Sequence, residues 1–177
     1  VDTPGHADFG GEVERVLKTV DGVLLLVDSF EGAMPQTREV LKIALALDLK
    51  PIVVINKIDK PAADPDHALD MVFDLFTELT DRDDLIDFPV VYSSSLLGIA
   101  KKEMEDESNT IEPLMNSIIE NISYPTGDVD KNLQFHVTTL DYNEYVGRIA
   151  VGRIINGSLK SQETVSHIKR DGTIEKG

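Results

Sequence analysis

Residues 56–59, with the sequence Asn-Lys-Ile-Asp, have the residue types and the spacing to recognise a guanine base. A guanine ring presents its N1–H and its N2 amino group side by side, and one carboxylate can accept hydrogen bonds from both as a charge-assisted pair. Asp59 would supply that carboxylate, and it would select against adenine, which has no such pair of donors. The alternative is that Asp59 only closes a turn and that the side chain of Lys57 is only solvated.

Neighbouring polar residues could complete a base site around Asp59. The amide of Asn56 can donate to the base and tie adjacent loops together, and the aliphatic stem of Lys57 can lie along a face of the base. Further along the chain, Ser94, Ser95 and Leu96 form a segment that could bring a backbone N–H to guanine O6, while the Ser94 hydroxyl holds the loop. The pattern Asn-Lys-x-Asp also recurs by chance, so its weight depends on the elements around it.

Residues 2–6, with the sequence Asp-Thr-Pro-Gly-His, could contact the phosphates of a nucleotide. The carboxylate of Asp2 can hold a hydrated Mg²⁺ ion through water, and Gly5 lets a backbone N–H approach a terminal phosphate closely. His6 could orient the water that attacks a γ-phosphate. The alternatives are that Asp2 closes a turn and that His6, like the other three histidines of the chain, is a surface or packing residue.

Continuous apolar runs predict buried strands that end next to these motifs. Such runs are typical of strands that are covered on both faces, and they lie at Val23–Val27, Pro51–Ile55 and Pro89–Tyr92. Residues 56–59 follow the second run directly, residues 94–96 follow the third closely, and Val1 would end a further strand ahead of residues 2–6. Open parallel sheets bind ligands at the carboxyl ends of their strands, so we expect the three motifs to meet at one edge.

The segments between these runs are predicted to be amphipathic helices, because their apolar residues recur every three or four positions. They extend from about Phe9 to Val20, from Pro35 to Leu47, from Asp64 to Leu79 and from Pro113 to Ile122. Strands that alternate with helices indicate an α/β fold, in which a parallel sheet is covered by helices on both faces and joined by right-handed crossovers.

A shift in charge predicts a domain boundary near residues 124–127, where Pro125 and Gly127 also interrupt the chain. Residues 1–124 carry 10 basic and 25 acidic side chains, whereas residues 125–177 carry 7 of each. We therefore predict a first domain over 1–124 and a linker over 125–132.

The remaining segment, residues 133–177, is predicted to be antiparallel β structure. Apolar and polar residues alternate over residues 133–138, as in a half-buried strand, and residues 146–154 have the composition of another strand. Asn156-Gly157 and Asp171-Gly172 are typical of tight turns. We interpret this part as the start of a β-barrel domain that is incomplete in this chain.

Composition excludes several classes of protein. The chain has 177 residues, no cysteine and a net charge of −15, which excludes disulfides and cysteine-based zinc sites and disfavours simple electrostatic adhesion to nucleic acid or anionic lipid. No apolar run approaches the roughly 18 residues that span a bilayer, and no signal-peptide pattern opens the chain. The chain starts within a motif at Val1 and stops at Gly177 within β structure, so we expect it to be an excerpt of a longer protein.

Residues 2–6 and 56–59 together resemble the motifs of the translational GTPases, the group of elongation factors Tu and G. The closer resemblance is to the TypA/BipA family of ribosome-associated GTPases. It covers essentially the whole chain, and the similar stretches are residues 1–17, 34–38, 51–57, 140–143 and 145–147. Gly10-Gly11-Glu12 and Asp141-Tyr142-Asn143 favour this family over LepA-like factors.

The resemblance implies a P-loop-NTPase-like G domain, followed by a β-barrel domain, in a cytoplasmic enzyme that binds GTP or GDP with Mg²⁺ and hydrolyses GTP. It implies that Asp2 is an indirect Mg²⁺ ligand, that Gly5 senses the γ-phosphate and that His6 is catalytic. The residues that would read guanine are Asn56, Lys57, Asp59, Ser94, Ser95 and Leu96. Relatives usually have Ala where this chain has Ser95, but the expected contact is made by backbone, so we expect little effect.

One part of the expected site has no counterpart in this sequence. GTPases hold phosphates with a Gly-x-x-x-x-Gly-Lys-[Ser/Thr] loop, and no such pattern occurs here, so we expect the excerpt alone to be inactive.

The resemblance implies that the partner is the ribosome, with its rRNA and its proteins, and that the contacts are made mainly by domains outside the excerpt. It implies no binding to membrane or to DNA. The alternatives are a non-catalytic guanine-nucleotide-binding module that docks on the ribosome, an acidic protein-interaction domain with a vestigial nucleotide site, and a LepA-like or elongation factor G-like protein.

Overall fold

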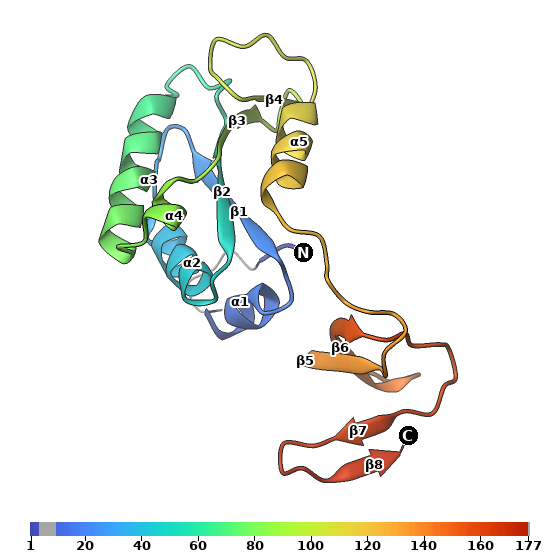
Figure 1. Ribbon diagram of the computed structural model, residues 1–177. Helices are drawn as coiled ribbons and strands as arrows, with labels where there is room; N and C mark the ends of the chain where they lie inside the picture. Colours follow the sequence, from blue (N-terminus) through green and yellow to red (C-terminus); the bar gives the residue numbers. More distant parts are fainter. Residues whose placement is uncertain (4–9, 177) are drawn as a thin grey trace. The chain divides into compact units, whose positions relative to one another are not determined.

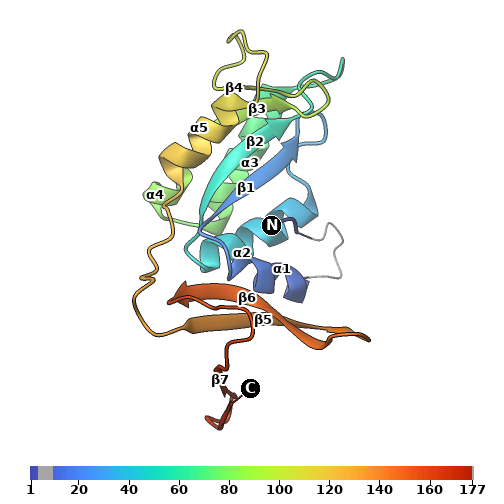
Figure 2. The ribbon, with the colours of Figure 1, turned by 90° about the vertical axis from the view of Figure 1, so that its right-hand side faces the viewer.

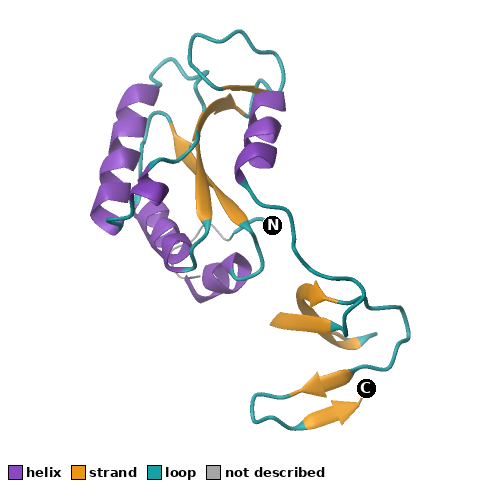
Figure 3. Ribbon diagram, in the orientation of Figure 1, coloured by secondary structure: helices purple, strands orange, loops and turns teal. Residues whose placement is uncertain are grey.

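The computed structural model describes residues 1–3 and 10–176 (Figure 1). The chain divides into two compact units, Val1–Pro125 and Thr126–Gly177. The first unit contains all of the helices of the described residues, and the second consists of strands and loops (Figure 3).

The first unit is built on a four-stranded sheet with the order β1-β2-β3-β4. Strands β1 (Gly22–Asp28), β2 (Lys50–Asn56) and β3 (Val90–Ser94) are parallel and coincide with the three predicted apolar runs. The short strand β4 (Ile99–Lys101) pairs antiparallel with β3, which the apolar pattern did not predict. The chain reverses at Gly98, whose φ of +67° suits glycine, and Ala100 is then buried.

In the described ranges, five helices connect and cover these strands: α1 (Gly10–Leu17), α2 (Pro35–Ala46), α3 (Pro65–Leu79), α4 (Asp83–Ile86) and α5 (Glu112–Asn121). Proline in the first turn favours the start of α2, α3 and α5, because its missing N–H would have no helical partner there. The Asp64 side chain caps α3 by accepting a hydrogen bond from the His67 N–H at 3.0 Å. These helices, and the strands between them, confirm the predicted α/β class.

Helices cover the two faces of the sheet unequally (Figures 1 and 2). On one face α2 and α3 pack against the sheet, and the core residues are Leu25, Val27, Leu41, Val53, Ile55, Ala68, Val72, Leu75, Phe76 and Tyr92. On the other face α5 covers Ile52, Val54, Val91 and Ala100 through Leu114. This second cover reaches the start of β1, where Ile122 lies against Gly22, but Leu26 further along the strand is 58% exposed. The prediction of a sheet covered on both faces therefore applies to β2 and β3 and to β1 only at its start, within the described residues.

The second unit contains two separate antiparallel hairpins. Strands β5 (Gln134–Asn143) and β6 (Gly147–Asn156) form one, and β7 (Ser166–Ile168) and β8 (Ile174–Lys176) form the other. At the first hairpin's turn, the side chain of Asn143 accepts a hydrogen bond from the Tyr145 N–H at 2.8 Å. Antiparallel structure is confirmed, and in the described part of this unit each sheet has two strands, so the barrel stays a prediction.

None of the helices in the described ranges has the length and apolarity that crossing a membrane requires.

The core of the first unit yields a matched stability test on helix α3. Phe76 is fully buried, and its ring centroid lies 4.2 Å from that of Phe88, whereas Phe73, on the same helix, is 49% exposed. Phe76→Ala is expected to lower the free energy of unfolding by about 3–5 kcal/mol, because it removes a packed ring and leaves a cavity. Phe73→Ala is expected to cost about 1 kcal/mol or less. Urea denaturation measures both values, and equal losses would contradict this packing.

Candidate functional site

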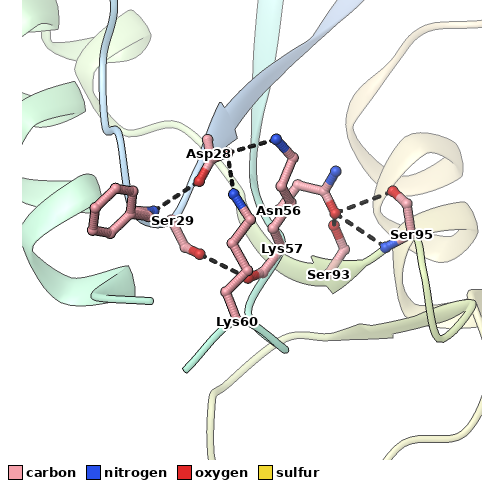
Figure 4. A network of polar contacts seen from close by, with 8 residues as sticks. Asp28, Ser29, Asn56, Lys57, Lys60, Ser93 and Ser95 are labelled. Atoms are coloured by element: carbon pink, nitrogen blue, oxygen red, sulfur yellow. Dashed lines mark hydrogen bonds and ion pairs between the residues drawn. The ribbon is translucent and has the colours of Figure 1, made fainter. Parts of the chain in front are cut away.

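The parallel register brings the loops after β1, β2 and β3 to one edge of the sheet. Asp28 at the end of β1 is paired with Asn56 at the end of β2, and Asn56 is paired with Ser93 on β3. Residues that are 28 and 37 positions apart in the sequence therefore lie on adjacent strands. Figure 4 shows two groups of polar side chains at this edge: Asp28 points toward Lys57 and Lys60, and Asn56 points toward Ser93 and Ser95.

The side chain of Asn56 links the loop after β2 to the loop after β3. Its Oδ1 atom accepts hydrogen bonds from Ser93 Oγ, the Ser95 N–H and Ser95 Oγ, each at 3.1 Å. A backbone N–H can only donate, so the atom that faces it must be the amide oxygen rather than the amide nitrogen. The Nδ2 group of Asn56 is thereby left to donate elsewhere.

Ser94 holds the carboxylate of Asp59. The fully buried Ser94 hydroxyl donates to Asp59 Oδ1 and accepts a hydrogen bond from the Leu97 N–H at 3.1 Å. Asp59 itself is exposed. Because each carboxylate oxygen has two lone pairs, the bond from Ser94 orients Asp59 and still leaves both of its oxygens able to accept from a ligand.

The backbone of the loop after β2 is strained and is held from both sides. Lys57 has a φ of +66°, in the left-handed region, which costs a non-glycine residue on the order of 1 kcal/mol or more. The Ser29 hydroxyl donates to the Lys57 carbonyl at 3.0 Å, and the Ser29 N–H donates to the Asn56 carbonyl at 2.9 Å. On the other side the Ile58 N–H donates to the Ser93 carbonyl at 3.2 Å. These bonds stabilise the strained conformation.

Asp28 pairs with two lysines of the same loop. Its Oδ2 atom lies 2.6 Å from Lys57 Nζ and 3.0 Å from Lys60 Nζ, and its Oδ1 atom accepts a hydrogen bond from the Phe30 N–H at 2.9 Å. The hydrogen bond from Lys57 is the largest cause that holds the pKa of Asp28 far below its ordinary range. The same bond raises the pKa of Lys57. Both groups are therefore charged at neutral pH.

The segment after β3 offers a backbone donor at Leu96. The Ser95 N–H is bonded to Asn56 and the Leu97 N–H is bonded to Ser94. Between them, the Leu96 N–H has no hydrogen bond to any residue that the structure describes. Leu96 is 83% exposed, so this N–H is accessible to an acceptor.

The structure brings together the site residues predicted on β2 and β3. These are Asn56, Lys57, Asp59, Ser94, Ser95 and Leu96. Of the predicted phosphate-side residues, Asp2 is exposed, and Gly5 and His6 lie outside the described residues. In the described ranges no three acidic or histidine side chains gather into a group that could hold a metal ion.

A cavity of about 630 Å³ lies between α1, α2 and β1. Asp2 is among its lining residues, together with Val13, Val23, Val40 and Ile43, and the base-site residues at the ends of β2 and β3 are not. Its wall is mainly apolar, so the cavity and the polar group at the strand ends are two separate features.

Four polar residues of this network were missed in the sequence, namely Asp28, Ser29, Lys60 and Ser93. Asp28 directly follows a buried apolar run, as residues 56–59 do. The rule that ligands bind at the carboxyl ends of parallel strands would have identified it. Ser29 and Lys60 carry no comparable signal, because their roles depend on contacts between loops that are about 30 residues apart.

Comparison with known proteins gives one family match and a set of similar relatives. The elongation factor Tu GTP binding domain family matches residues 1–124. The large ribosomal subunit assembly factor BipA of Synechocystis sp. is 55% identical over 177 residues, which are all of this chain and 30% of that protein. BipA of Bacillus subtilis is 50% identical over 173 residues, which are 98% of this chain and 28% of that protein. The chain thus spans about 30% of the length of the curated relatives that it matches.

A solved structure supports the fold. Translation elongation factor SelB from Methanococcus maripaludis, in complex with the GTP analogue GppNHp, matches with a TM-score of 0.70 and 22% sequence identity. The match covers 93% of this chain and 34% of the SelB chain. At this identity the likeness concerns the fold alone.

The ion cluster at Asp28 predicts a pH-dependent stability difference. Because folding lowers the pKa of Asp28, its contribution is present above the ordinary carboxyl pKa of about 3.9 and is lost as the pH falls below that value. Asp28→Asn is expected to lower the free energy of unfolding at pH 7 by on the order of 1 kcal/mol, since solvent screens the half-exposed lysines.

Urea denaturation of the parent and of Asp28→Asn, at pH 7 and at about pH 3.5, measures this difference. The gap between the two proteins should narrow at the lower pH. As a control, Asp70→Asn changes an exposed carboxylate on α3 and should alter stability little at either pH. A gap of the same size at both values of pH would contradict the assignment.

Proposed function

Because the chain belongs to the elongation factor Tu GTP-binding domain family, we propose that it binds guanine nucleotides at the ends of β2 and β3 and takes part in GTP hydrolysis. Within that family it belongs to the TypA/BipA family of translational GTPases. The observation that carries the proposal is the contact of Asp59 with buried Ser94. It orients an exposed carboxylate for the paired donors of a guanine ring.

Three groups at the site are complementary to the edge of guanine. Asp59 accepts from N1–H and from the N2 amino group. The Leu96 N–H, which has no bond to any described residue, donates to O6. The Nδ2 group of Asn56 donates to a base nitrogen, because its Oδ1 atom is already bonded to Ser93 and Ser95. Adenine would place an amino group against the Leu96 N–H and would leave Asp59 without its pair of donors.

The phosphate side of the site rests on residues 2–6. Asp2 would hold Mg²⁺ through water, as suits a single exposed carboxylate. Gly5 would contact the γ-phosphate through its N–H, and His6 would orient the attacking water. When bound, Mg²⁺ neutralises charge on the phosphates. The phosphate-binding loop would come from sequence outside residues 1–177, because none occurs within them.

We further propose that the chain functions within a protein of the length of its relatives and acts on the ribosome in the cytoplasm. The relatives are named as large ribosomal subunit assembly factors. The first 124 residues carry 25 acidic and 10 basic side chains, which disfavours extensive contact with RNA phosphates. Contacts with rRNA would therefore be made mainly by other parts of the protein.

Guanine selection is tested by Asp59→Asn in the full-length protein. The change removes a charged acceptor of the N1–H and N2 donors, which contributes roughly 1.5–3 kcal/mol. GTP binding should weaken by about tenfold or more. Binding of xanthosine triphosphate should improve, because xanthine has a carbonyl where guanine has the amino group. Equilibrium titration with both nucleotides measures the two affinities, and Asp70→Asn on α3 is the control. Unchanged GTP affinity in the Asp59 variant would contradict the role of Asp59 in guanine selection.

Catalysis is tested by His6→Ala in the full-length protein. Phosphoryl transfer depends mainly on positioning, so loss of the water-orienting group should slow ribosome-stimulated hydrolysis by about a hundredfold. GTP affinity should stay nearly the same, because the imidazole acts in the transition state rather than in ground-state binding.

Single-turnover hydrolysis on ribosomes, beside equilibrium nucleotide binding, separates these two effects. His67→Ala, which truncates an exposed histidine on α3, is the matched control. If the His6 variant hydrolyses GTP at the parent rate, the catalytic role of His6 is contradicted and His6 is a surface residue. A parent protein that binds GTP without turnover would favour the non-catalytic docking module.

A further inference from the structure

Lys57 is held at both of its ends. Its backbone is bonded through its carbonyl to the Ser29 hydroxyl at 3.0 Å, and its ammonium group lies 2.6 Å from Asp28 Oδ2 (Figure 4). Between these points the side chain remains 49% exposed. The stem of Lys57 is therefore fixed in direction while a large part of its surface is open to a ligand.

Asp28 is suited to hold this lysine in place. Its side chain is only 10% exposed, and its two oxygens are used by different partners. Oδ1 accepts the hydrogen bond from the Phe30 N–H at 2.9 Å, which fixes the carboxylate relative to β1. Oδ2 accepts hydrogen bonds from the ammonium groups of Lys57 and Lys60. Lys60 adds a second positive charge at 3.0 Å, which keeps Asp28 ionised and compensated.

A free lysine stem has several rotatable bonds, and ordering it on ligand binding costs conformational entropy. A stem that is already ordered avoids this cost, which is the general benefit of a preorganised site. The fixed part of Lys57 is aliphatic, so it can pack against the flat face of a base. Asp59 and the Leu96 N–H would form hydrogen bonds with the edge of the base.

We propose that Asp28 is a positioning residue that holds the Lys57 stem as a preformed surface for the face of the guanine base. This inference rests on the proposed guanine-nucleotide function of the site and adds a residue that sets its affinity. Contact with a face is insensitive to the groups at the edge of a base. Asp28 therefore affects how tightly a purine nucleotide binds, and Asp59 determines which purine is bound.

The test compares binding of GDP and of inosine diphosphate to the full-length protein, by equilibrium titration. Inosine lacks the N2 amino group but keeps the face of the purine. Asp28→Asn should weaken both nucleotides by the same factor, about tenfold, and leave their ratio unchanged. In a Lys57→Met background, which keeps an apolar stem without the ammonium group, Asp28→Asn should cause no further loss.

Two further variants complete the design. Asp48→Asn removes a carboxylate that pairs with Arg82 on another part of the first unit, and it should leave both affinities at the parent values. Asp28→Glu keeps the charge but shifts its position by one methylene, and it should give a smaller loss than Asp28→Asn. Asp28→Glu also serves if Asp28→Asn does not fold, which thermal unfolding reports.

The outcomes separate this inference from the proposed function. If the parent binds GDP and Asp28→Asn binds it equally well, or more tightly because Lys57 is released to the ligand, the positioning role is overturned and the proposed function stands. If Asp28→Asn also abolishes the preference for GDP over inosine diphosphate, Asp28 maintains the whole loop and the specific role is overturned. A full-length parent that binds neither nucleotide overturns both proposals.

Discussion

The parallel register of β1, β2 and β3 is the constraint on which the candidate site depends. It sets Asp28 beside Asn56 and Asn56 beside Ser93, so that three loops from distant parts of the sequence start at the same edge. A shift of one residue in either pairing would turn the strand-end side chains to the opposite face. The core prevents such a shift, because alternate residues of β2 are buried against different helices, Val53 and Ile55 on one face and Ile52 and Val54 on the other.

The site combines rigid support with exposed contact groups. Buried Ser29, Ser93 and Ser94 have hydrogen-bond partners on neighbouring loops. Ser94 holds the exposed carboxylate of Asp59, and Ser29 holds the backbone of Lys57, whose side chain is exposed. In the described residues, no buried side-chain polar atom lacks a hydrogen-bond partner. This division lets polar loops meet in a fixed geometry without the cost of unsatisfied buried groups.

Electrostatics at this edge differ from those of the first unit as a whole. The unit is strongly acidic, with 25 acidic and 10 basic side chains over residues 1–124. At the strand ends, however, Asp28 is paired with two lysines, Lys57 and Lys60. These lysines compensate the acidic side chains nearby, which include Asp59 and Glu31.

Several large apolar side chains are exposed in each of the two units. Leu26 on β1 and Leu140, Tyr142 and Val146 in the first hairpin are each more than half exposed. Apolar surface of this kind is stabilised when it is covered by other protein. The chain spans about 30% of the length of its curated relatives.

The sequence by itself determined the three parallel strands and most of the helices of the first unit, and it predicted a base-reading role for residues 56–59. Continuous apolar runs identified β1, β2 and β3, and three- and four-residue periodicity identified α2, α3 and α5, because both signals are local. The roles of Asp59 and Ser94 in reading guanine were predicted from residue type and strand-end position, and they stay predictions, as do those of Asp2, Gly5 and His6.

Only the tertiary structure decided the rest. Strand β4 is three residues long and has too few positions to carry a periodic signal, so its antiparallel pairing with β3 depends on the turn at Gly98. The amide orientation of Asn56 depends on the Ser95 N–H, which lies 39 residues away in the sequence. The contact of Asp28 with Lys57 joins residues 29 positions apart. Such contacts exist only because hydrophobic packing sets the register of the sheet, and no local pattern in the sequence encodes that register.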